Sequence, residues 1–409
     1  MKYLTLLIIF LLSNITVSKA QTMGCTDTQA SNYNASATIN DGSCIYNNTS
    51  VSPILALSIS DSVIETSGLI QWNNTFWTHN DNTDLNLYAL DTLTGTITKK
   101  TALPNCFNID WEDMAQDSLF VYVGDFGNNV NGNRTNLQIL RISKSSINAN
   151  NPIIDTIRFS YSNQTNFASS GANNTNFDCE AFVVSRDSIF LFTKQWVNKK
   201  TSLYVLSKQP GIWVATLKDS LSVQGLVTGA TYLEDKKAVA LCGYTTFLQP
   251  FITLLYDFKQ HHFFKGNNRR LNVSLPFHQT EGISSLNGYR FYVSNEKFSN
   301  SSITTPQAIH LFDLSSFLEP YYSATSIKKK DKITYDLSIT PNPTQNALYV
   351  QSNVKQKIGY LIFNMSGELV AKGSVEPNES IDITHFKNGT YTIKLETDLI
   401  TKSIKFIKQ

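Results

Sequence analysis

Hydrophobic and polar positions recur in a fixed order between residues 51 and about 318. Each repeat opens with a polar or acidic residue followed by small and apolar ones, as in Glu65-Thr-Ser-Gly-Leu and Thr280-Glu-Gly-Ile. An apolar strand that ends in polar groups comes next, as in Phe76-Trp-Thr-His-Asn-Asp, and a second apolar strand follows. The starts of the repeats lie 47, 68, about 50 and about 51 residues apart, and the long step contains a loop rich in Ser, Asn and Gly between Ser160 and Asp178. This spacing is typical of β-propeller blades.

The edges of this repeat pattern predict how a ring of blades would close. A fourth strand follows in the first four repeats, but the fifth repeat has no obvious one. The apolar run Pro53-Ile-Leu-Ala-Leu-Ser-Ile-Ser precedes the first repeat, and as the missing strand it would leave no exposed sheet edge. We therefore expect an all-β protein with a five-bladed β-propeller over residues 51–318, or six blades if one repeat is degenerate.

The N-terminus has the pattern of a secretory signal peptide. A positive residue, the apolar run Leu4 to Leu12 and the small-residue cleavage site Ser18-Lys19-Ala20 predict it over residues 1–20. The apolar run is too short to span a membrane, and no other stretch approaches the length of a transmembrane helix. The mature protein is therefore expected to be exported without a transmembrane segment.

Residues 21–50 form a small separate segment. Between Gly-Cys-Thr-Asp and Asp-Gly-Ser-Cys it resembles a short repeat of secreted Bacteroidetes proteins. So small a unit cannot bury a core, and a disulfide between Cys25 and Cys44 is the expected staple in an oxidising compartment. Asp27, Asn40 and Asp41 can offer oxygen ligands to Ca²⁺, although an Asx turn at Asp41 is the favoured alternative.

The C-terminal residues 336–409 predict a small β-sandwich, with strands alternating around the turn signals Asn364-Met-Ser-Gly-Glu and Lys387-Asn-Gly-Thr. Pro341-Asn-Pro, Gly389-Thr-Tyr and the Lys-rich end resemble the C-terminal sorting domain of type IX secretion system cargo from Bacteroidetes-type bacteria. The resemblance implies recognition by that secretion machinery and a secreted or outer cell-surface protein. Residues 319–335 are expected to be a linker.

Composition narrows the classes of ligand. Charged residues make up 16% of the chain, and the formal net charge is only +2. Since no strongly basic surface is expected, nucleic acid is excluded as a partner. The sequence also contains no Gly-X-Ser-X-Gly elbow, His-Glu-X-X-His pair or phosphate loop, so a nucleophilic hydrolase is unsupported.

Propeller geometry gathers carboxylates at one mouth of the channel. Neighbouring strands of a blade are antiparallel, so the first strand begins on the face where the second strand ends. The acidic starts would meet there, and several carboxylates suit Ca²⁺. They can equally accept backbone N–H groups, and the fourth repeat has Gly229-Ala-Thr where an acid would stand. The candidate metal ligands are Glu65, Glu112, Glu180 and Glu281, with Asp110 and Asp178 beside them.

A second polar set lies where the second strands end, and it differs from one repeat to the next. Because repeat-building roles would recur, we expect these unlike residues to contact a ligand. The candidates are His79, Asp81, Asp125, Asn128, Lys194 and Glu296.

Two functions from different classes follow. The favoured one is a propeller that binds a polysaccharide or protein ligand at one channel face. The alternative is a Ca²⁺-dependent hydrolase of esterase or phosphatase type, because residues 51–318 resemble secreted propellers that include SdiA-regulated proteins and esterase-like phytases. That resemblance rests on Glu65-Thr-Ser-Gly-Leu and Glu281-Gly-Ile. A passive surface protein that only displays loops is a third interpretation.

Overall fold

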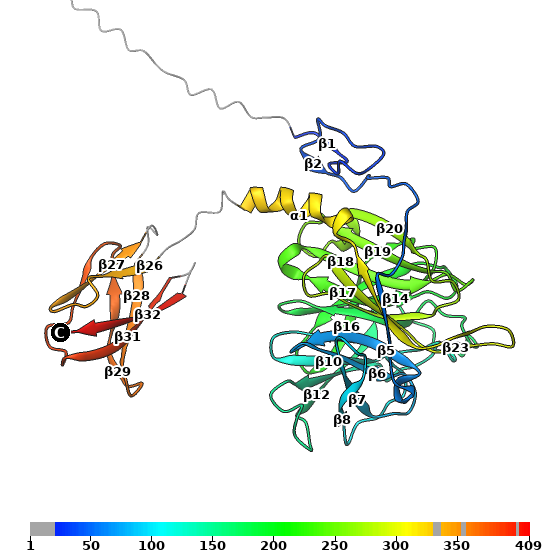
Figure 1. Cartoon of the computed structure of the whole chain (residues 1–409), viewed down its shortest axis with the longest axis horizontal. Helices are drawn as coiled ribbons and strands as arrows, with labels where there is room; N and C mark the ends of the chain where they lie inside the picture. Colours follow the sequence, from blue (N-terminus) through cyan, green and yellow to red (C-terminus); the bar gives the residue numbers. More distant parts are fainter. Residues whose placement is uncertain (1–20, 330–336, 353–356, 398–400) are drawn as a thin grey trace, which may run out of the picture. The chain divides into compact units, whose positions relative to one another are not determined.

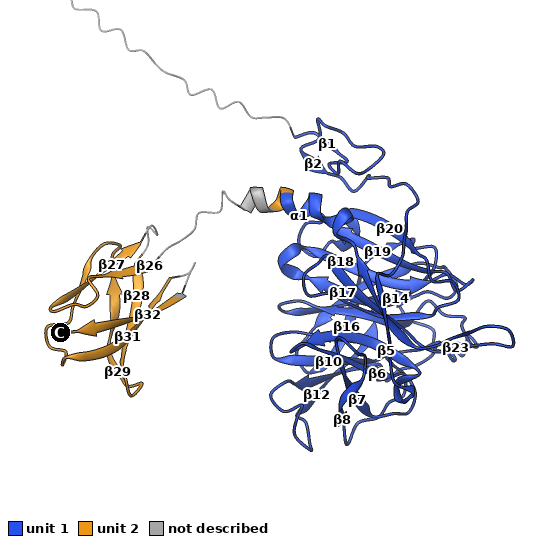
Figure 2. Ribbon diagram, viewed as in Figure 1, with its two compact units in different colours: residues 1–323 blue, residues 324–409 orange. Residues whose placement is uncertain are grey.

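The computed structural model describes residues 21–329, 337–352, 357–397 and 401–409. The predicted signal peptide therefore lies outside the described residues. The chain divides into two compact units, residues 1–323 and 324–409 (Figure 2). Among the described residues, no helix combines the length and apolar character that crossing a membrane requires.

Unit 1 contains five groups of four antiparallel strands (Figure 1), and the outermost strands of the second and third groups pair in parallel, which joins these two groups into one eight-stranded sheet. The first group is β5 (Thr66–Trp72), β6 (Thr75–Asn80), β7 (Asn86–Asp91) and β8 (Ile97–Ala102). The second is β9 (Trp111–Gln116), β10 (Phe120–Asp125), β11 (Gln138–Ser143) and β12 (Ile154–Tyr161). The third is β13 (Asp178–Val184), β14 (Ser188–Lys194), β15 (Thr201–Ser207) and β16 (Gly211–Leu221).

The remaining two groups use strands from both ends of the repeat region. The fourth is β17 (Leu226–Leu233), β18 (Ala238–Tyr244), β19 (Pro250–Tyr256) and β20 (Asn267–Val273), with β3 (Ser50–Val51) at its edge. The fifth is β21 (Thr280–Ser284), β22 (Arg290–Asn295), β25 (Ala308–Asp313) and β4 (Leu55–Ser58). Short elements lie between them: η1 (Asp61–Val63), η2 (Glu234–Lys236), η3 (Phe263–Lys265), β23 (Phe298–Ser299) and β24 (Thr304–Thr305).

The innermost strands of the five groups form a closed ring. Contacts run from β5 to β9, β13, β17 and β21, and from β21 back to β5. The strand expected over residues 53–60 is β4, and it pairs antiparallel with β25, with Leu57 opposite Ile309. The N-terminal strand therefore completes the last group, and unit 1 has a propeller-like fold.

In each of the five groups, the innermost strand has one extra residue relative to the second strand, and this extra residue lies at the same place in every repeat. In β5, for example, Thr66 pairs with Asn80 and Leu69 with Thr78, so two residues face one. Equivalent shifts occur in the other four groups. Such β-bulges bend a strand and redirect the side chain at the extra position. The side chains at the five bulges are Ser67, Glu112, Glu180, Thr228 and Glu281.

The inner strands approach so closely that two bulge positions require glycine. A Cβ atom on Gly68 would lie 2.2 Å from the backbone nitrogen of Met114, and one on Gly229 would lie 2.4 Å from the carbonyl oxygen of Glu281. The bulge hydroxyls use the same proximity, because Thr228 Oγ1 donates to the Thr280 carbonyl at 2.5 Å. The hydrophobic core lies between adjacent groups, as with Phe126 and Phe182.

The N-terminal module, residues 21–47, packs on the fourth group. It contains β1 (Met23–Gly24) and β2 (Ile39–Asn40), and the predicted Cys25–Cys44 disulfide is present. The Asp27 carboxylate accepts hydrogen bonds from the Tyr256 hydroxyl at 2.6 Å and the Tyr46 hydroxyl at 2.8 Å. The three cysteines outside the module are free.

Helix α1 (Ser315–Lys329) occupies much of the segment that we expected to be a linker, residues 319–335. Leu318 and Tyr322 are buried against the core beside the fourth and fifth groups, which explains why a helix forms. Residues 330–336 lie outside the described residues.

Unit 2 has two sheets around one core, as expected of a β-sandwich. One sheet is β26 (Leu337–Thr340), β27 (Ala347–Ser352) and β30 (Ser380–Asp382). The other is β28 (Ile358–Asn364), β29 (Leu369–Val375), β31 (Gly389–Glu396) and β32 (Thr401–Lys408). Leu348, Ile362 and Ile393 are fully buried between them.

Candidate functional site

One end of the channel, which we call the polar mouth, gathers acidic residues around a single lysine. It lies where the inner strands begin and the second strands end. Its floor is buried and consists of Glu112, Asp178, Glu180, Lys194 and Glu281. Its rim is partly exposed and consists of Glu65, Asp81, Asp110 and Glu296. Eight carboxyl groups thus surround one ammonium group.

Lys194 forms the centre of the floor. Its Nζ forms an ion pair with Glu180 and donates to the Tyr244 hydroxyl at 3.2 Å. It also lies 4.8 Å from the ring centroid of Trp196. Burial alone would lower the pKa of Lys194, but Glu180, Tyr244 and Glu281 together hold that pKa well above its usual value. Lys194 is therefore a fixed positive charge.

Asp178 already has its hydrogen-bond donors. The backbone N–H of Asn128 donates to one carboxylate oxygen at 2.6 Å, and Trp196 Nε1 donates to the other at 2.7 Å. One oxygen from each of Asp178, Glu112 and Glu180 lies within 4.8 Å of the others. Asp178 and Glu180 thus already accept hydrogen bonds from protein donors, whereas Glu112 accepts none from the described residues.

Glu112 and Glu281 are 5% and 6% exposed, and neither carboxyl accepts a hydrogen bond from the described residues. Neither has an oxygen that is both fully buried and unpartnered, so both carboxyls keep some access to solvent. Burial raises the pKa of each carboxyl well above its usual value, and neighbouring carboxylates raise it further. Beside Glu112, the Cβ of an alanine at position 127 would lie 2.2 Å from Glu112 Oε1 and 2.3 Å from Asp110 Oδ2. The absence of a side chain at Gly127 therefore lets these two carboxylates pack against the backbone at this position.

The rim carboxyls are also perturbed. Burial, with Glu296 and Glu65 next in importance, raises the pKa of Asp81 to about 7. Burial raises the pKa of Glu296 to about 7 as well, with Lys194 opposing the shift and Glu65 adding to it. The pKa of Asp110 rises to about 6, through burial and then Asp178. Asp81 and Glu296 thus exchange protons near neutral pH.

The structure separates the predicted site residues into two groups. It brings Asp81, Lys194 and Glu296 together with all four predicted metal ligands. Asp125 instead pairs with Arg134 at 2.9 Å and accepts from Gln138 at 3.0 Å, so it fixes a loop.

His79 and Asn128 are also buried. His79 packs edge-on against Trp111, its Nε2 has no partner, and burial lowers its pKa to about 4. Asn128 acts through its backbone N–H on Asp178. The sequence reasoning missed Tyr244 and Trp196, and the signal for Tyr244 was its place at the end of a second strand, equivalent to Lys194.

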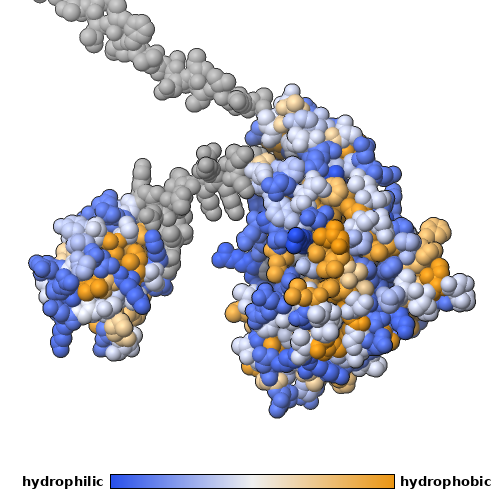
Figure 3. Space-filling model, in the orientation of Figure 1, coloured by the Kyte–Doolittle hydropathy of each residue, from blue (hydrophilic) through white to orange (hydrophobic). Residues whose placement is uncertain are grey.

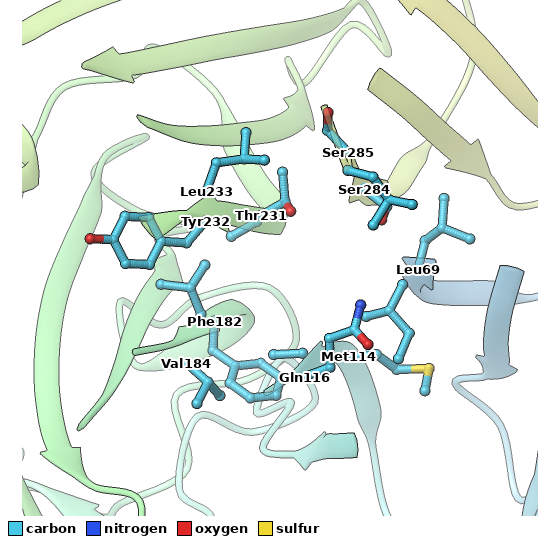
Figure 4. Close-up of a pocket in the computed structure, with 15 residues that line it drawn as sticks. Leu69, Met114, Gln116, Phe182, Val184, Thr231, Tyr232, Leu233, Ser284 and Ser285 are labelled. Atoms are coloured by element: carbon cyan, nitrogen blue, oxygen red, sulfur yellow. The ribbon is translucent and has the colours of Figure 1, made fainter. Parts of the chain in front are cut away.

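The other end of the channel, which we call the apolar mouth, is lined by the far ends of the same inner strands. Side chains from β5, β9, β13, β17 and β21 surround a cavity of about 240 Å³ (Figure 4). Its lining includes Leu69, Met114, Phe182, Thr231 and Ser284. Between the mouths, the buried Asp113 carboxylate accepts backbone N–H groups of Phe182 at 3.1 Å and Ala230 at 3.3 Å.

Comparisons with solved structures find low-identity matches. The crystal structure of the RRP9 WD40 repeats is 8% identical, with a TM-score of 0.35, and the match covers 65% of this chain and all of that one. A protein of unknown function from Dyadobacter fermentans is 9% identical, with a TM-score of 0.36, covering 64% of this chain and 98% of that one. No curated protein matches the sequence.

The C-terminal residues match a known family. Residues 338–409 match the family of secretion system C-terminal sorting domains. This match covers nearly all of the described part of unit 2, including the two sheets of the sandwich. The chain therefore carries a type IX sorting domain, which implies export and a secreted or cell-surface protein.

Proposed function

We propose that this protein is a secreted five-bladed β-propeller that binds a positively charged ligand at its polar mouth. The observation that carries the proposal is the pair of buried carboxyls, Glu112 and Glu281, which lack a hydrogen-bond donor among the described residues. A buried carboxylate without a partner is costly, so such a group is either protonated or paired with a cation. A cationic ligand at the polar mouth would supply the missing countercharge.

Five blades, rather than six, are supported by the ring of contacts among the inner strands. In the described residues that ring has five members, each the first strand of a four-stranded group. The domain boundaries 51–318 and 336–409 and the signal peptide 1–20 remain predictions, as does the direct partnership with the type IX machinery.

Thermal unfolding of the full chain tests cation binding. Methylguanidinium and Ca²⁺ serve as probes, with chelator as the blank, because an ion that binds only the folded state raises the midpoint. We expect a rise with at least one probe that disappears in the variant Glu112→Gln/Glu281→Gln. The matched control is Glu234→Gln, an exposed acid outside the polar mouth. The proposal fails if no probe shifts the midpoint, or if the double variant shifts like the wild type.

A Ca²⁺-dependent hydrolase is the second candidate, and one observation favours it. Asp81 and Glu296 both have a pKa of about 7, which suits a general acid or base. Glu112, Asp178 and Glu180, whose oxygens lie within 4.8 Å of one another, would hold the ion, which would polarise an ester or phosphate. The Lys194 ammonium opposes a divalent ion nearby. Calcium-dependent release of p-nitrophenol from an ester or phosphate, lost in Glu112→Gln, would favour this candidate.

A further inference from the structure

The loops that surround the polar mouth carry exposed hydrophobic side chains. These loops precede the inner strands or follow the second strands of each group. Phe107 is 74% exposed and Phe247 86% exposed. In the described part of residues 51–318, Trp213 is the only exposed aromatic residue that lies elsewhere. We call these four phenylalanines and three aliphatic residues the aromatic rim, as distinct from the acidic rim of the polar mouth: Phe107, Ile109, Val130, Phe167, Val197, Phe247 and Phe277.

Hydrogen bonds between neighbouring loops hold the aromatic rim in place. The backbone N–H of Phe277 donates to the Leu248 carbonyl at 2.8 Å, which joins two rim loops. The Phe107 carbonyl accepts from Trp111 Nε1 at 3.0 Å, and Trp111 directly precedes Glu112. These contacts fix the loops of Phe107, Phe247 and Phe277, so binding would lose little entropy in this part of the aromatic rim.

A protein surface rarely exposes several large aromatic side chains together unless they meet a partner. Aromatic anchors around a desolvated charged pocket are typical of protein interfaces, where charge complementarity selects the partner. Here the floor and its immediate rim are acidic, and the loops around them expose apolar side chains. Figure 3 shows apolar residues exposed among polar ones on one face of unit 1 as well, so exposure alone does not single out the rim.

We propose that the polar mouth takes an arginine or lysine side chain of a protein partner, whose apolar flanking residues contact the aromatic rim. This inference rests on the proposed cation site and names its ligand. Guanidinium and ammonium groups donate several hydrogen bonds, which matches the undonated carboxyls Glu112 and Glu281 and the rim acid Asp81. Lys194, already paired with Glu180, shows that the floor accommodates an alkyl ammonium.

Two alternative ligands, a free metal ion and a neutral polysaccharide, would each contact only part of this surface. A free metal ion would not contact the aromatic rim, and Lys194 would repel a divalent ion more strongly than a monovalent side chain. A neutral polysaccharide would stack on the rim but would leave the buried carboxyls without a countercharge. A basic residue flanked by apolar ones uses both the floor and the rim.

Binding of a short peptide to the full chain tests this proposal. The probe is fluorescently labelled acetyl-Leu-Leu-Arg-Leu-Leu-amide, and its matched control carries citrulline in place of arginine, which keeps the shape and removes the charge. We expect the arginine peptide to bind at least about tenfold more tightly than the citrulline peptide and than methylguanidinium. Glu112→Gln/Glu281→Gln should abolish the preference for arginine.

The aromatic rim is tested separately. Phe107→Ala/Phe247→Ala should weaken the peptide about tenfold while leaving the methylguanidinium affinity unchanged. Leu93→Ala is the control, since Leu93 is 81% exposed on the turn between β7 and β8, away from the rim. The circular dichroism spectrum of each variant confirms folding.

The outcomes separate this inference from the proposed function. If methylguanidinium binds through Glu112 but the peptide binds no more tightly, the inference is overturned and the cation site stands. If neither binds, both fail. If dextran binds and is lost only in Phe107→Ala/Phe247→Ala, the rim is a glycan surface and the inference is overturned.

Discussion

The two mouths of the channel are built from the same five strands and yet differ in charge, because the apolar mouth mixes uncharged polar side chains with apolar ones and the polar mouth is acidic. At the apolar mouth, Leu69, Met114 and Phe182 line the cavity. At the polar mouth, eight carboxyl groups surround Lys194. The difference shows that the repeated backbone fixes where side chains meet, whereas the residue at each bulge decides what chemistry they bring.

The energetic character of the mouths differs as well. Apolar burial depends little on pH, because no group there changes its charge. The polar mouth depends on protons or cations, because burial raises the pKa values of its acids. The predictions below use variants that separate these two kinds of stability.

Removal of the Lys194 ammonium group from the floor of the polar mouth should have the largest effect on stability. Lys194→Met leaves Glu180 buried without its partner, so the free energy of unfolding should fall by about 3–5 kcal/mol. Urea unfolding at pH 7 measures it, and Glu180→Gln/Lys194→Met should recover much of the loss. Lys265→Met is the control, because the Lys265–Asp219 pair is exposed and such pairs contribute about 0–1 kcal/mol. Equal losses in both single variants would contradict the central role of Lys194.

At the apolar mouth, truncation of a buried side chain should be nearly as costly. Met114→Ala removes a side chain that is 1% exposed, and it should cost about 2 kcal/mol or more through lost burial and a cavity. The loss should be the same at pH 5 and pH 7.5 in urea unfolding. Leu286→Ala, 59% exposed beside the same cavity, should change stability by less than about 0.5 kcal/mol. A strong pH dependence for Met114→Ala would contradict the distinction between the mouths.

Adding a side chain at Gly127, next to the Glu112 carboxylate, should have an intermediate effect. Gly127→Ala places a methyl group 2.2 Å from Glu112 Oε1, so the carboxylates must move at a cost of about 1–3 kcal/mol. Methylguanidinium should then no longer raise the midpoint of thermal unfolding. The control is Gly359→Ala in unit 2, where the nearest atom would lie at 3.5 Å. Unchanged probe binding in Gly127→Ala would place the cation elsewhere.

The smallest effect should come from the rim acids. Their pKa of about 7 in the folded state lies above the unfolded values, so the unfolded chain loses protons first as pH rises. The free energy of unfolding should therefore fall between roughly pH 4 and pH 7, by the order of 1 kcal/mol after solvent screening. Asp81→Asn/Glu296→Gln should remove this contribution in urea unfolding at pH 5, 6 and 7.5.

The pH dependence of unfolding must be compared between the variant Asp81→Asn/Glu296→Gln and the wild type. Burial lowers the pKa of His79 and His310 to about 4, so these groups make stability rise with pH below about 6.5 and partly offset the acids. If the double variant keeps the pH dependence of the wild type, Asp81 and Glu296 are not its source.

Much of this architecture could be predicted from the sequence, because it rests on local patterns. Alternation of apolar residues gave the strands, and the apolar run at 53–60 gave the closing strand β4. The disulfide followed from the small size of the segment around Cys25 and Cys44. The acidic residues that begin the repeats also lie together at the polar mouth, since antiparallel pairing alone brings strand starts and strand ends to one face.

Other features depend on register and tertiary packing, which a repeat pattern does not reveal. Glu65 had been aligned with Glu112, but the bulge places Ser67 at the equivalent position and leaves Glu65 on the rim. In the fourth repeat the bulge residue is Thr228, rather than Gly229. The exposure of Phe107 and Phe247 was missed as well, because a phenylalanine in a loop is indistinguishable in sequence from one that folds back into the core.

The pairing of β4 with β25 has a consequence for how the protein folds. Leu57 and Ile309 are neighbours in the sheet although some 250 residues separate them along the chain, and contacts of such long sequence separation form slowly. Until they form, β25 presents an unpaired edge that can recruit strands from other molecules. A chain that emerges N-terminus first must therefore hold β4 unpaired until β25 has followed, and the time between these events is when aggregation threatens it most.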